Sequence, residues 1–375
     1  MVSRRRLLTG ATVVGAGALA AAAGGIAYAG AEPRRIPRTL ARERGQVASR
    51  EQNVVADFTL THLSVTAAAS AAVRLRDGSG GWGEWIELST CQGGRDGITR
   101  AGDRSLVLAH GVTGYEVQTA DGSPAVVREL NTIDGPAGQV AAIAKNALPL
   151  RGSAPLELSS RYLPRQAWGA DESLRLNPDG TQKWPAEYYP VQVLTVHHTG
   201  LYAHNDDPDP AATVRAIYYD DTISDDYGDV GYQLLIDEAG TVYEGRWSGD
   251  DGVPVYGGTA GPDGRPKAVN GAHVGSFNAG NVGVSLLGRF TSRQPTAAAR
   301  ASLVKVLAGF ASLNNLNPTG QVDYVNPVSG RGGRVNSILG HRDWAAIGAA
   351  ATECPGDAFH PTLTALRQEV AAQLG

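Results

Sequence analysis

The sequence predicts an α/β fold with a central mixed β-sheet flanked by helices, preceded by a small all-β, sandwich-like region. Two observations predict this arrangement. Up to about residue 132, short alternating strands are separated by Gly- and Asp-rich turns, a pattern typical of β-sandwiches. From about residue 159, buried apolar runs alternate with amphipathic helical patterns, which is typical of a sheet covered by helices. The hydrophobic content of 42% is sufficient for a core in each region.

Residues 1–31 are predicted to be an export signal of the twin-arginine type. Arg4, Arg5 and Arg6 precede a run rich in Ala and Gly, and Ala27-Tyr28-Ala29 is a small-x-small cleavage pattern. Paired arginines before a weakly apolar run direct the export of proteins that are already folded. We therefore expect an exported protein, secreted or associated with the cell wall, with no permanent membrane span. The alternative is an uncleaved membrane anchor, which Ala and Gly form poorly.

The next segments are predicted from their periodicity. Residues 32–51 are rich in Arg and Pro without an apolar period, so we expect a flexible spacer. The all-β region is predicted over residues 52–132, and Trp82 and Trp85 within it either stack on sugar rings or pack in the core or at a sheet edge. Residues 133–158 are weakly patterned and are expected to be a linker.

The α/β region is predicted over residues 159–375. The apolar, β-branched run at 191–196 predicts a buried central strand, and the run at 282–287 predicts a second one. Asp209 and Pro210 are suited to cap and begin a helix. Apolar residues at helical spacing predict two further helices, at 303–313 and 363–374. A turn between two short apolar runs predicts a hairpin at 232–243.

The charge and the cysteine content exclude several classes of protein. The 33 basic and 37 acidic residues give a net charge of −4, which argues against a basic nucleic-acid-binding surface. Two cysteines, Cys91 and Cys354, are too few for a disulfide-rich miniprotein. They leave three uses open: one disulfide, a metal ligand or a nucleophile.

Candidate metal ligands gather at the ends of predicted strands. His197 and His198 end the first buried strand, His341 follows a late short strand, and Cys354 comes thirteen residues after His341. Histidine and thiolate are preferred zinc ligands, and three protein ligands with one open position is the catalytic arrangement. Only one of the two adjacent histidines can face the site, because side chains alternate along a strand. Spacing alone leaves a structural role open for each residue.

Residues from about 160 to 375 resemble the peptidoglycan recognition protein family, which is related to phage lysozyme-type amidases. The segments that carry the resemblance stand in the family's order: Arg165-Gln166-Ala167-Trp168-Gly169-Ala170, Val196-His197-His198-Thr199, Asp229-Val230-Gly231-Tyr232, Tyr243-Glu244-Gly245-Arg246, Gly271-Ala272-His273, Asn281-Val282-Gly283-Val284, Gly340-His341-Arg342-Asp343 and Thr352-Glu353-Cys354-Pro355-Gly356-Asp357. Many members are zinc-dependent N-acetylmuramoyl-L-alanine amidases. The resemblance therefore implies a monomeric enzyme that acts on peptidoglycan or muropeptides with one Zn²⁺ per domain.

The resemblance also implies roles for individual residues. His197, His341 and Cys354 match the zinc ligands, and family members that bind without cutting lack the cysteine. Tyr232 matches the tyrosine that contacts the zinc-bound water or the developing oxyanion, and Thr352 stands where relatives carry Thr or Lys facing the site. The remaining expected site residues are the substrate-groove residues His273, Phe277 and Asn278, and His198 and Asp343 behind the ligands. The sequence departs from the family at Phe277, where relatives often have Tyr, and at Tyr219-Asp220, where relatives commonly have an aromatic-His pair.

Two alternatives to the amidase remain. The first is a module of the same fold that binds peptidoglycan without cutting it, and the second is a secreted structural protein with a Cys91–Cys354 disulfide. The two cysteines lie in different predicted regions, and export of the folded protein would let zinc bind Cys354 in the reducing cytosol. We therefore predict Cys354 as a zinc ligand and Cys91 as a buried, unpaired thiol.

Overall fold

The structure is a computed structural model, and it describes residues 34–89, 93–98, 103–140, 145–201 and 206–375. The expected export signal and Cys91 lie outside the described residues. Among the helices of the described part of the chain, none has the length and apolar character needed to cross a membrane.

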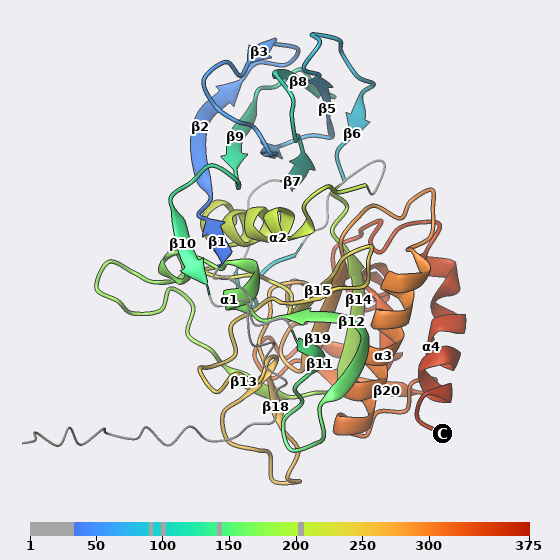
Figure 1. Ribbon diagram of the computed structural model, residues 1–375. Coiled ribbons are helices and arrows are strands. Elements are labelled where there is room, and N and C mark those ends of the chain that lie inside the picture. The colour runs from blue at the N-terminus through green and yellow to red at the C-terminus, as the bar shows by residue number, and fades with distance from the viewer. Residues whose placement is uncertain (1–33, 90–92, 99–102, 141–144, 202–205) are drawn as a thin grey trace, which may run out of the picture.

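An all-β region, here called the accessory region (residues 40–131), confirms the prediction of a sandwich-like unit before the α/β fold (Figure 1). Its core contains Leu63, Val73, Val117 and Val127, each at most 1% exposed. One sheet has the order β2 (Leu40–Val47), β9 (Ala125–Asn131), β4 (His62–Ala67) and β7 (Asp103–Leu108). The other has the order β3 (Asn53–Val54), β8 (Gly114–Thr119), β5 (Ala71–Arg76) and β6 (Ile86–Glu87).

Strand β2 corrects the expectation of a flexible spacer over residues 32–51. It pairs antiparallel with β9 from Leu40 to Val47. Arg42 Nε and Arg44 Nε each donate to the fully buried carboxylate of Glu129 at 2.6 Å. The arginine-rich segment is ordered because its charges pair with a buried acid of β9, a partner that local composition does not reveal.

The carboxyl-terminal region (residues 145–375) is built on a seven-stranded mixed sheet, as the sequence predicts. Strands β15, β19, β14 and β22 run parallel, whereas β16 is antiparallel to β15. Residues 133–158 were expected to form a linker, but β11 and β12 begin inside this range and form the edge of the sheet. The same range also contains β10 (Ala137–Val140), which pairs with β1 (Arg34–Pro37). The sheet has the order β11 (Lys145–Leu148), β12 (Leu156–Leu163), β16 (Val242–Glu244), β15 (Leu234–Ile236), β19 (Asn281–Leu286), β14 (Val193–His198) and β22 (Ile338–Gly340).

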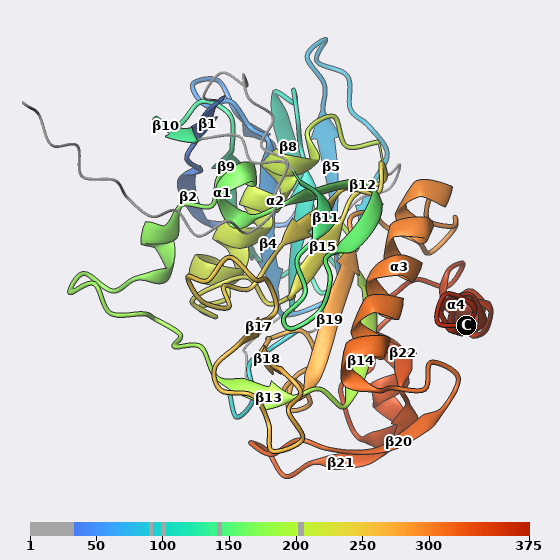
Figure 2. The ribbon, with the colours of Figure 1, turned by 60° about the horizontal axis from the view of Figure 1, so that its bottom comes forward.

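Helices cover both faces of this sheet (Figures 1 and 2). Helices α3 (Ala297–Asn314) and α4 (Leu363–Ala372) lie on one face and share a core with β14 and β19. On the other face, α1 (Arg165–Trp168) and α2 (Pro210–Tyr219) pack against β15 and β16. Helix α2 begins as predicted, because the Asp209 carboxylate accepts from the Ala212 N–H at 3.1 Å and Pro210 occupies the first turn.

The remaining strands form small ladders at the periphery of the carboxyl-terminal region and next to the accessory region. The Gln321–Asn336 segment, which the sequence did not assign to strands, forms a hairpin that follows α3. The ladders are β1 (Arg34–Pro37) with β10 (Ala137–Val140), β13 (Tyr188–Pro190) with β18 (Lys267–Val269) and β17 (Tyr256–Gly257), and β20 (Gln321–Val325) with β21 (Gly332–Asn336).

A buried ion cluster joins three of the family-like segments. The Asp229 carboxylate binds Arg165 Nη1 at 2.9 Å and Arg246 Nη1 at 2.8 Å, and its side chain is fully buried. Burial would raise the pKa of Asp229, but the two guanidinium groups and the N–H groups of Trp247 and Val230 lower it below its ordinary value. The cluster thus ties the start of the carboxyl-terminal region to the loops on either side of β15 and β16.

The accessory region is docked on helix α2. His62 Nε2 lies 3.0 Å from Thr213 Oγ1. Arg215 of α2 donates to the carbonyl of Thr132, the residue after β9, at 3.1 Å, and Arg104 of β7 pairs with Asp225, which follows α2 along the chain, at 2.5 Å. Burial lowers the pKa of His62 to about 3, so its ring is neutral at this interface.

Candidate metal centre

The candidate centre lies at the carboxyl ends of the parallel strands β14 and β22. Their register places Val196 opposite Gly340, so that His197 and His341 follow at the same edge of the sheet. On the other side of β14, His197 is opposite Ser285 of β19. Parallel strands present their carboxyl ends at one edge, which is why two histidines 144 positions apart come together.

Cys354 reaches the same edge from a turn after β22. Its carbonyl accepts from the Arg342 N–H at 2.9 Å, and its N–H donates to Thr352 Oγ1 at 3.2 Å. Gly356 has a φ of 106°, and a Cβ there would lie 2.3 Å from the Phe290 carbonyl group, so only glycine fits. These constraints hold the turn against the residue that follows His341.

The structure brings together His197, His341 and Cys354. One ligand atom from each residue lies within 4.8 Å of the other two, and Cys354 Sγ is 3.6 Å from His197 Nδ1. All three side chains are at most 1% exposed. A buried cluster of two imidazoles and one thiol could hold a metal ion.

A chain of hydrogen bonds defines which nitrogen of His197 is available. His273 Nε2 lies 3.2 Å from the Asn281 carbonyl, which can only accept, so this nitrogen carries the proton. His273 Nδ1 therefore accepts from His197 Nε2–H across 3.0 Å. In this arrangement the lone pair of His197 Nδ1 points toward Cys354, as a metal ligand requires.

The ring of His273 packs against Gly283. A Cβ at Gly283 of β19 would lie 2.7 Å from three ring atoms of His273. The glycine of the Asn281–Val284 segment therefore leaves room for this imidazole. The sequence predicts His273 in the substrate groove, but the structure places it behind His197 with 1% exposure.

His198 supports the cysteine from the opposite face of β14. Its backbone N–H donates to Cys354 Sγ at 3.3 Å, a contact that stabilises a thiolate. Its side chain points away, with Nδ1 accepting from the Phe290 N–H at 3.2 Å. The sequence predicts His198 behind the ligands, but no feature of the sequence predicts the hydrogen bond from its backbone N–H to Cys354 Sγ.

Tyr232 and Thr352 lie beside the cluster. The half-buried Tyr232 has its ring centroid 5.2 Å from that of His197, in an edge-on arrangement. Thr352 is half-buried, and its hydroxyl accepts from the N–H of Cys354. Each of the two residues therefore contacts one of the candidate metal ligands directly.

The other two expected substrate residues, Phe277 and Asn278, are both buried. Phe277 is fully buried and packs against Trp344 and Tyr324, with ring centroids 5.3 and 6.4 Å apart, so its prediction as a substrate contact is corrected to a core role. Asn278 is also fully buried. Its side-chain oxygen accepts from the N–H groups of His273 and Val274, both at 2.8 Å.

Asp343 holds the start of the His341 segment. One carboxylate oxygen accepts from the Gly340 N–H at 2.8 Å, and the other lies 2.6 Å from His360 Nε2. Burial would raise the pKa of Asp343, but these hydrogen bonds and the nearby positive charges lower it. His360 is a partner that sequence reasoning missed, because nothing in the local pattern of residues 359–362 distinguishes it.

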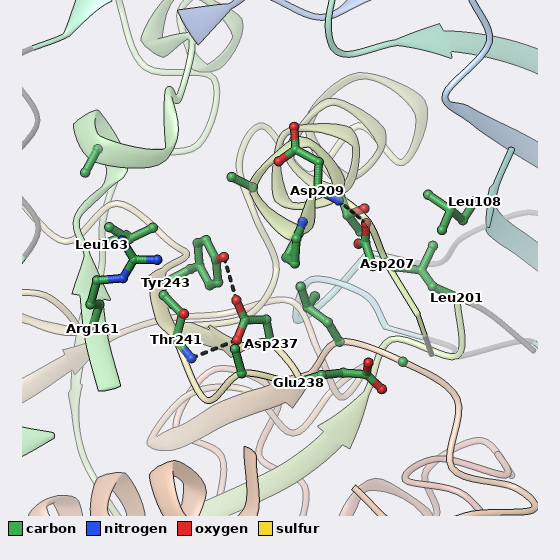
Figure 3. Close-up of a pocket in the computed structure, with 17 residues that line it drawn as sticks. Leu108, Arg161, Leu163, Leu201, Asp207, Asp209, Asp237, Glu238, Thr241 and Tyr243 are labelled. Atoms are coloured by element: carbon green, nitrogen blue, oxygen red, sulfur yellow. Dashed lines mark hydrogen bonds between the residues drawn. The ribbon is translucent and has the colours of Figure 1, made fainter. Parts of the chain in front are cut away.

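A separate cavity of about 470 Å³ lies between the accessory region and the outer end of the sheet (Figure 3). Its lining includes Leu108 and the acids Asp207 and Asp237, and the Asp237 carboxylate accepts from Tyr243 Oη and the Thr241 N–H, both at 2.8 Å. Burial raises the pKa of Asp207. The metal-ligand cluster does not line this cavity, so the two sites are distinct.

Part of the carboxyl-terminal region is similar to proteins of known function. Residues 187–357 match the family model described as N-acetylmuramoyl-L-alanine amidase. Human N-acetylmuramoyl-L-alanine amidase is 29% identical over 232 residues, 60% of this chain and 31% of the human protein. Bovine peptidoglycan recognition protein 1 is 29% identical over 133 residues, 36% of this chain and 60% of the bovine protein.

The solved structure of Drosophila PGRP-LB matches 55% of this chain and 94% of its own, with 22% identity and a TM-score of 0.38. The chain covers less than two thirds of the length of the human and bovine relatives. Residues 187–357 therefore match the N-acetylmuramoyl-L-alanine amidase family, and the relatives of this chain include a peptidoglycan recognition protein.

Proposed function

We propose that the carboxyl-terminal region is a zinc-dependent amidase that hydrolyses the bond between N-acetylmuramic acid and L-alanine in peptidoglycan or muropeptides. The observation that carries the proposal is the convergence of His197, His341 and Cys354 at one sheet edge. The family match supports the class of reaction, and the retained cysteine favours an enzyme over a module that only binds. We further propose that the protein acts outside the cytoplasm as a monomer.

The cluster fits zinc. In a tetrahedral site with Zn–S of about 2.3 Å and Zn–N of about 2.0–2.1 Å, sulfur and nitrogen lie about 3.6 Å apart. Cys354 Sγ and His197 Nδ1 are 3.6 Å apart. With one thiolate and two neutral imidazoles, a divalent ion keeps a net positive charge. When bound, zinc would acidify a water to a pKa of about 7 and polarise the scissile carbonyl.

The chain's own residues orient these ligands and the substrate. His273 holds His197 in the Nε2–H tautomer, and the His198 N–H holds the sulfur of Cys354. Tyr232 is the donor that we assign to the oxyanion that develops when water adds to the amide carbonyl. Thr352 positions the cysteine turn, because its hydroxyl accepts from the Cys354 N–H.

The amidase is tested by incubating the purified full chain with peptidoglycan and measuring new L-alanine amino termini, together with the zinc content. Cys354→Ser should remove most of the bound zinc and lower activity by at least about 100-fold, because a hydroxyl is a poor zinc ligand at neutral pH. Cys91→Ser makes the same chemical change at the other cysteine and should leave zinc content and activity unchanged.

Each alternative has its own outcome. A protein that binds peptidoglycan and zinc but releases no amino termini is a binding module. Equal losses in Cys354→Ser and Cys91→Ser, accompanied by loss of a disulfide, would indicate the structural protein. Full activity in Cys354→Ser would rule out the proposed metal centre.

A further inference from the structure

A short stretch of the accessory region lies on the carboxyl-terminal region beside the metal-ligand cluster. This covering segment (residues 93–98) follows β6 and comes before β7. The Gly94 N–H donates to the Ala272 carbonyl at 2.9 Å, and the Gly94 carbonyl accepts from Asn278 Nδ2 at 2.7 Å. Ala272 and Asn278 flank His273, so the covering segment lies against the residues expected to form the substrate groove.

The carboxylate of Asp96 in the covering segment is bound by N–H groups of Asn278 and Ala279, here called the carboxylate receptor. Its Oδ1 accepts from the Asn278 N–H at 3.1 Å and from Asn278 Nδ2 at 3.0 Å, while its Oδ2 accepts from the Ala279 N–H at 3.0 Å. Three converging N–H donors are a recognition pattern for a carboxylate.

The receptor is built by the carboxyl-terminal region itself. Asn278 is fully buried, and its amide oxygen is held by the N–H groups of His273 and Val274. The orientation of its Nδ2 group is therefore defined without Asp96. A different carboxylate would meet the same three donors.

Arg95 and Gly93 extend the contact. The Arg95 guanidinium lies 4.6 Å from the centroid of the Trp184 ring, and Arg95 Nη1 is 3.4 Å from the Tyr227 carbonyl. A Cβ at Gly93 would lie 2.7 Å from the Ala272 carbonyl oxygen. The backbone of the covering segment therefore lies close to the backbone at Ala272.

The stretch just before the covering segment lies on the other side of the cluster. The Glu87 carbonyl accepts from Arg289, which also pairs with Glu353, the residue before Cys354, at 3.5 Å. Ser89 approaches Gly200, three residues after His197. Accessory residues therefore contact both the cysteine side and the His273 side of the metal ligands.

Tyr232 faces a space that these residues close. It lines a cavity of about 70 Å³ together with Ser89 and Gly93 of the accessory region and Thr199 and Gly200 of the carboxyl-terminal region. Gly93 of the covering segment therefore borders the space beside the proposed catalytic tyrosine.

We propose that the covering segment occupies, in cis, a binding site for a carboxylate-bearing peptide, with Asp96 in the place of the ligand's carboxylate. The inference rests on the proposed function, because the ligand is the acidic stem peptide of peptidoglycan. The segment must leave the Asn278–Ala279 receptor before the polymer reaches Tyr232 and the metal ligands. The accessory region thereby holds the enzyme in a closed state.

The test compares Asp96→Ala with Asp121→Ala in the full chain without added metal. Asp121 is an acid of the exposed β8–β9 turn, and its carboxylate accepts from the N–H and the hydroxyl of Ser123. The first measurement is amide hydrogen exchange at Asn278 and Ala279, and the second is the affinity for a soluble muramyl peptide by calorimetry. Apparent affinity scales with the fraction of open molecules, so Asp96→Ala should bind at least about five-fold more tightly and exchange faster. Asp121→Ala should match the wild type.

Arg95→Ala removes a different contact of the same segment and should shift both measurements in the same direction. Unchanged or weaker peptide binding by both Asp96→Ala and Arg95→Ala, or no binding by any of the proteins, would overturn the inference. The amidase is judged separately by Cys354→Ser. Tighter binding without cleavage by the zinc-loaded variants would retain the covering role and reject the proposed hydrolysis.

Discussion

At the residue scale, the candidate metal site is defined by contacts that His197, His341 and Cys354 make with their neighbours. The types and order of His197, His341 and Cys354 made them predictable from sequence, since each stands in a recognisable segment at a strand end or turn. The tautomer of His197 was not predictable, because it depends on His273 and on the Asn281 carbonyl, two partners that only the folded sheet brings together.

The role assigned to His273 leads to a measurable change in metal affinity. His273→Phe preserves the ring volume but removes both hydrogen bonds, so His197 loses its orienting partner. We expect zinc affinity, measured by competition with a chromophoric chelator, to fall by about 10–100-fold. His110→Phe changes an exposed histidine of the accessory region and should have no effect. An unchanged affinity in His273→Phe would contradict the orienting role.

At the scale of the elements, most of the central sheet and its helices could be predicted, whereas the strands bordering it could not. The runs that form β14 and β19 are apolar because both faces of these strands are buried, and the cap of α2 is local in sequence. The composition of β2 predicts a spacer, because its arginines are typical of a solvated segment. Their buried partner, Glu129, lies more than 80 residues away along the chain.

The buried ion cluster around Asp229 predicts that Asp229→Asn strongly lowers the free energy of unfolding. Asp229→Asn leaves the guanidinium groups of Arg165 and Arg246 without their shared carboxylate, and breaking a buried pair in this way costs about 3–5 kcal/mol. Denaturant titration should show this fall in the free energy of unfolding. The control is Asp323→Asn, which breaks the exposed pair with Arg334 on the β20–β21 hairpin and should leave the midpoint unchanged. Equal midpoints for Asp229→Asn and wild type would show that the cluster does not stabilise the fold.

At the scale of the whole molecule, the docking of the accessory region could not be read from the sequence. It depends on single contacts between distant segments, such as His62 with Thr213 and Asp96 with Asn278. No periodicity or motif marks these residues, because each is recognised only by the surface that it meets. Among these contacts, the one made by His62 links the docking of the accessory region to pH.

His62 predicts that stability falls on acidification. Burial lowers its pKa to about 3 in the folded protein, with the charges of His110 and Arg215 acting in the same direction. In the unfolded chain the pKa is about 6.5, so the unfolded state binds the proton first. The contribution of His62 is fully present above about pH 6.5 and is lost progressively as the pH falls toward 3.

His62→Gln should therefore flatten the dependence of unfolding free energy on pH between about 6.5 and 4, because glutamine does not titrate but can still bond to Thr61 and Thr213. The measurement is denaturant unfolding at several pH values. His110→Gln, at an exposed position, should retain most of the slope. A wild-type slope in His62→Gln would contradict this account.

The position of β14 between two parallel neighbours has a consequence for folding. Residues 197 and 198 are both histidine, so a slip of one position would present the wrong imidazole to the cluster while leaving the composition of the strand end unchanged. The ladders with β19 and β22 prevent that slip from both sides. Metal uptake during refolding would thus be a spectroscopic reporter of correct strand pairing. With cobalt in place of zinc, colour would develop only in molecules whose central sheet has assembled in the native alignment.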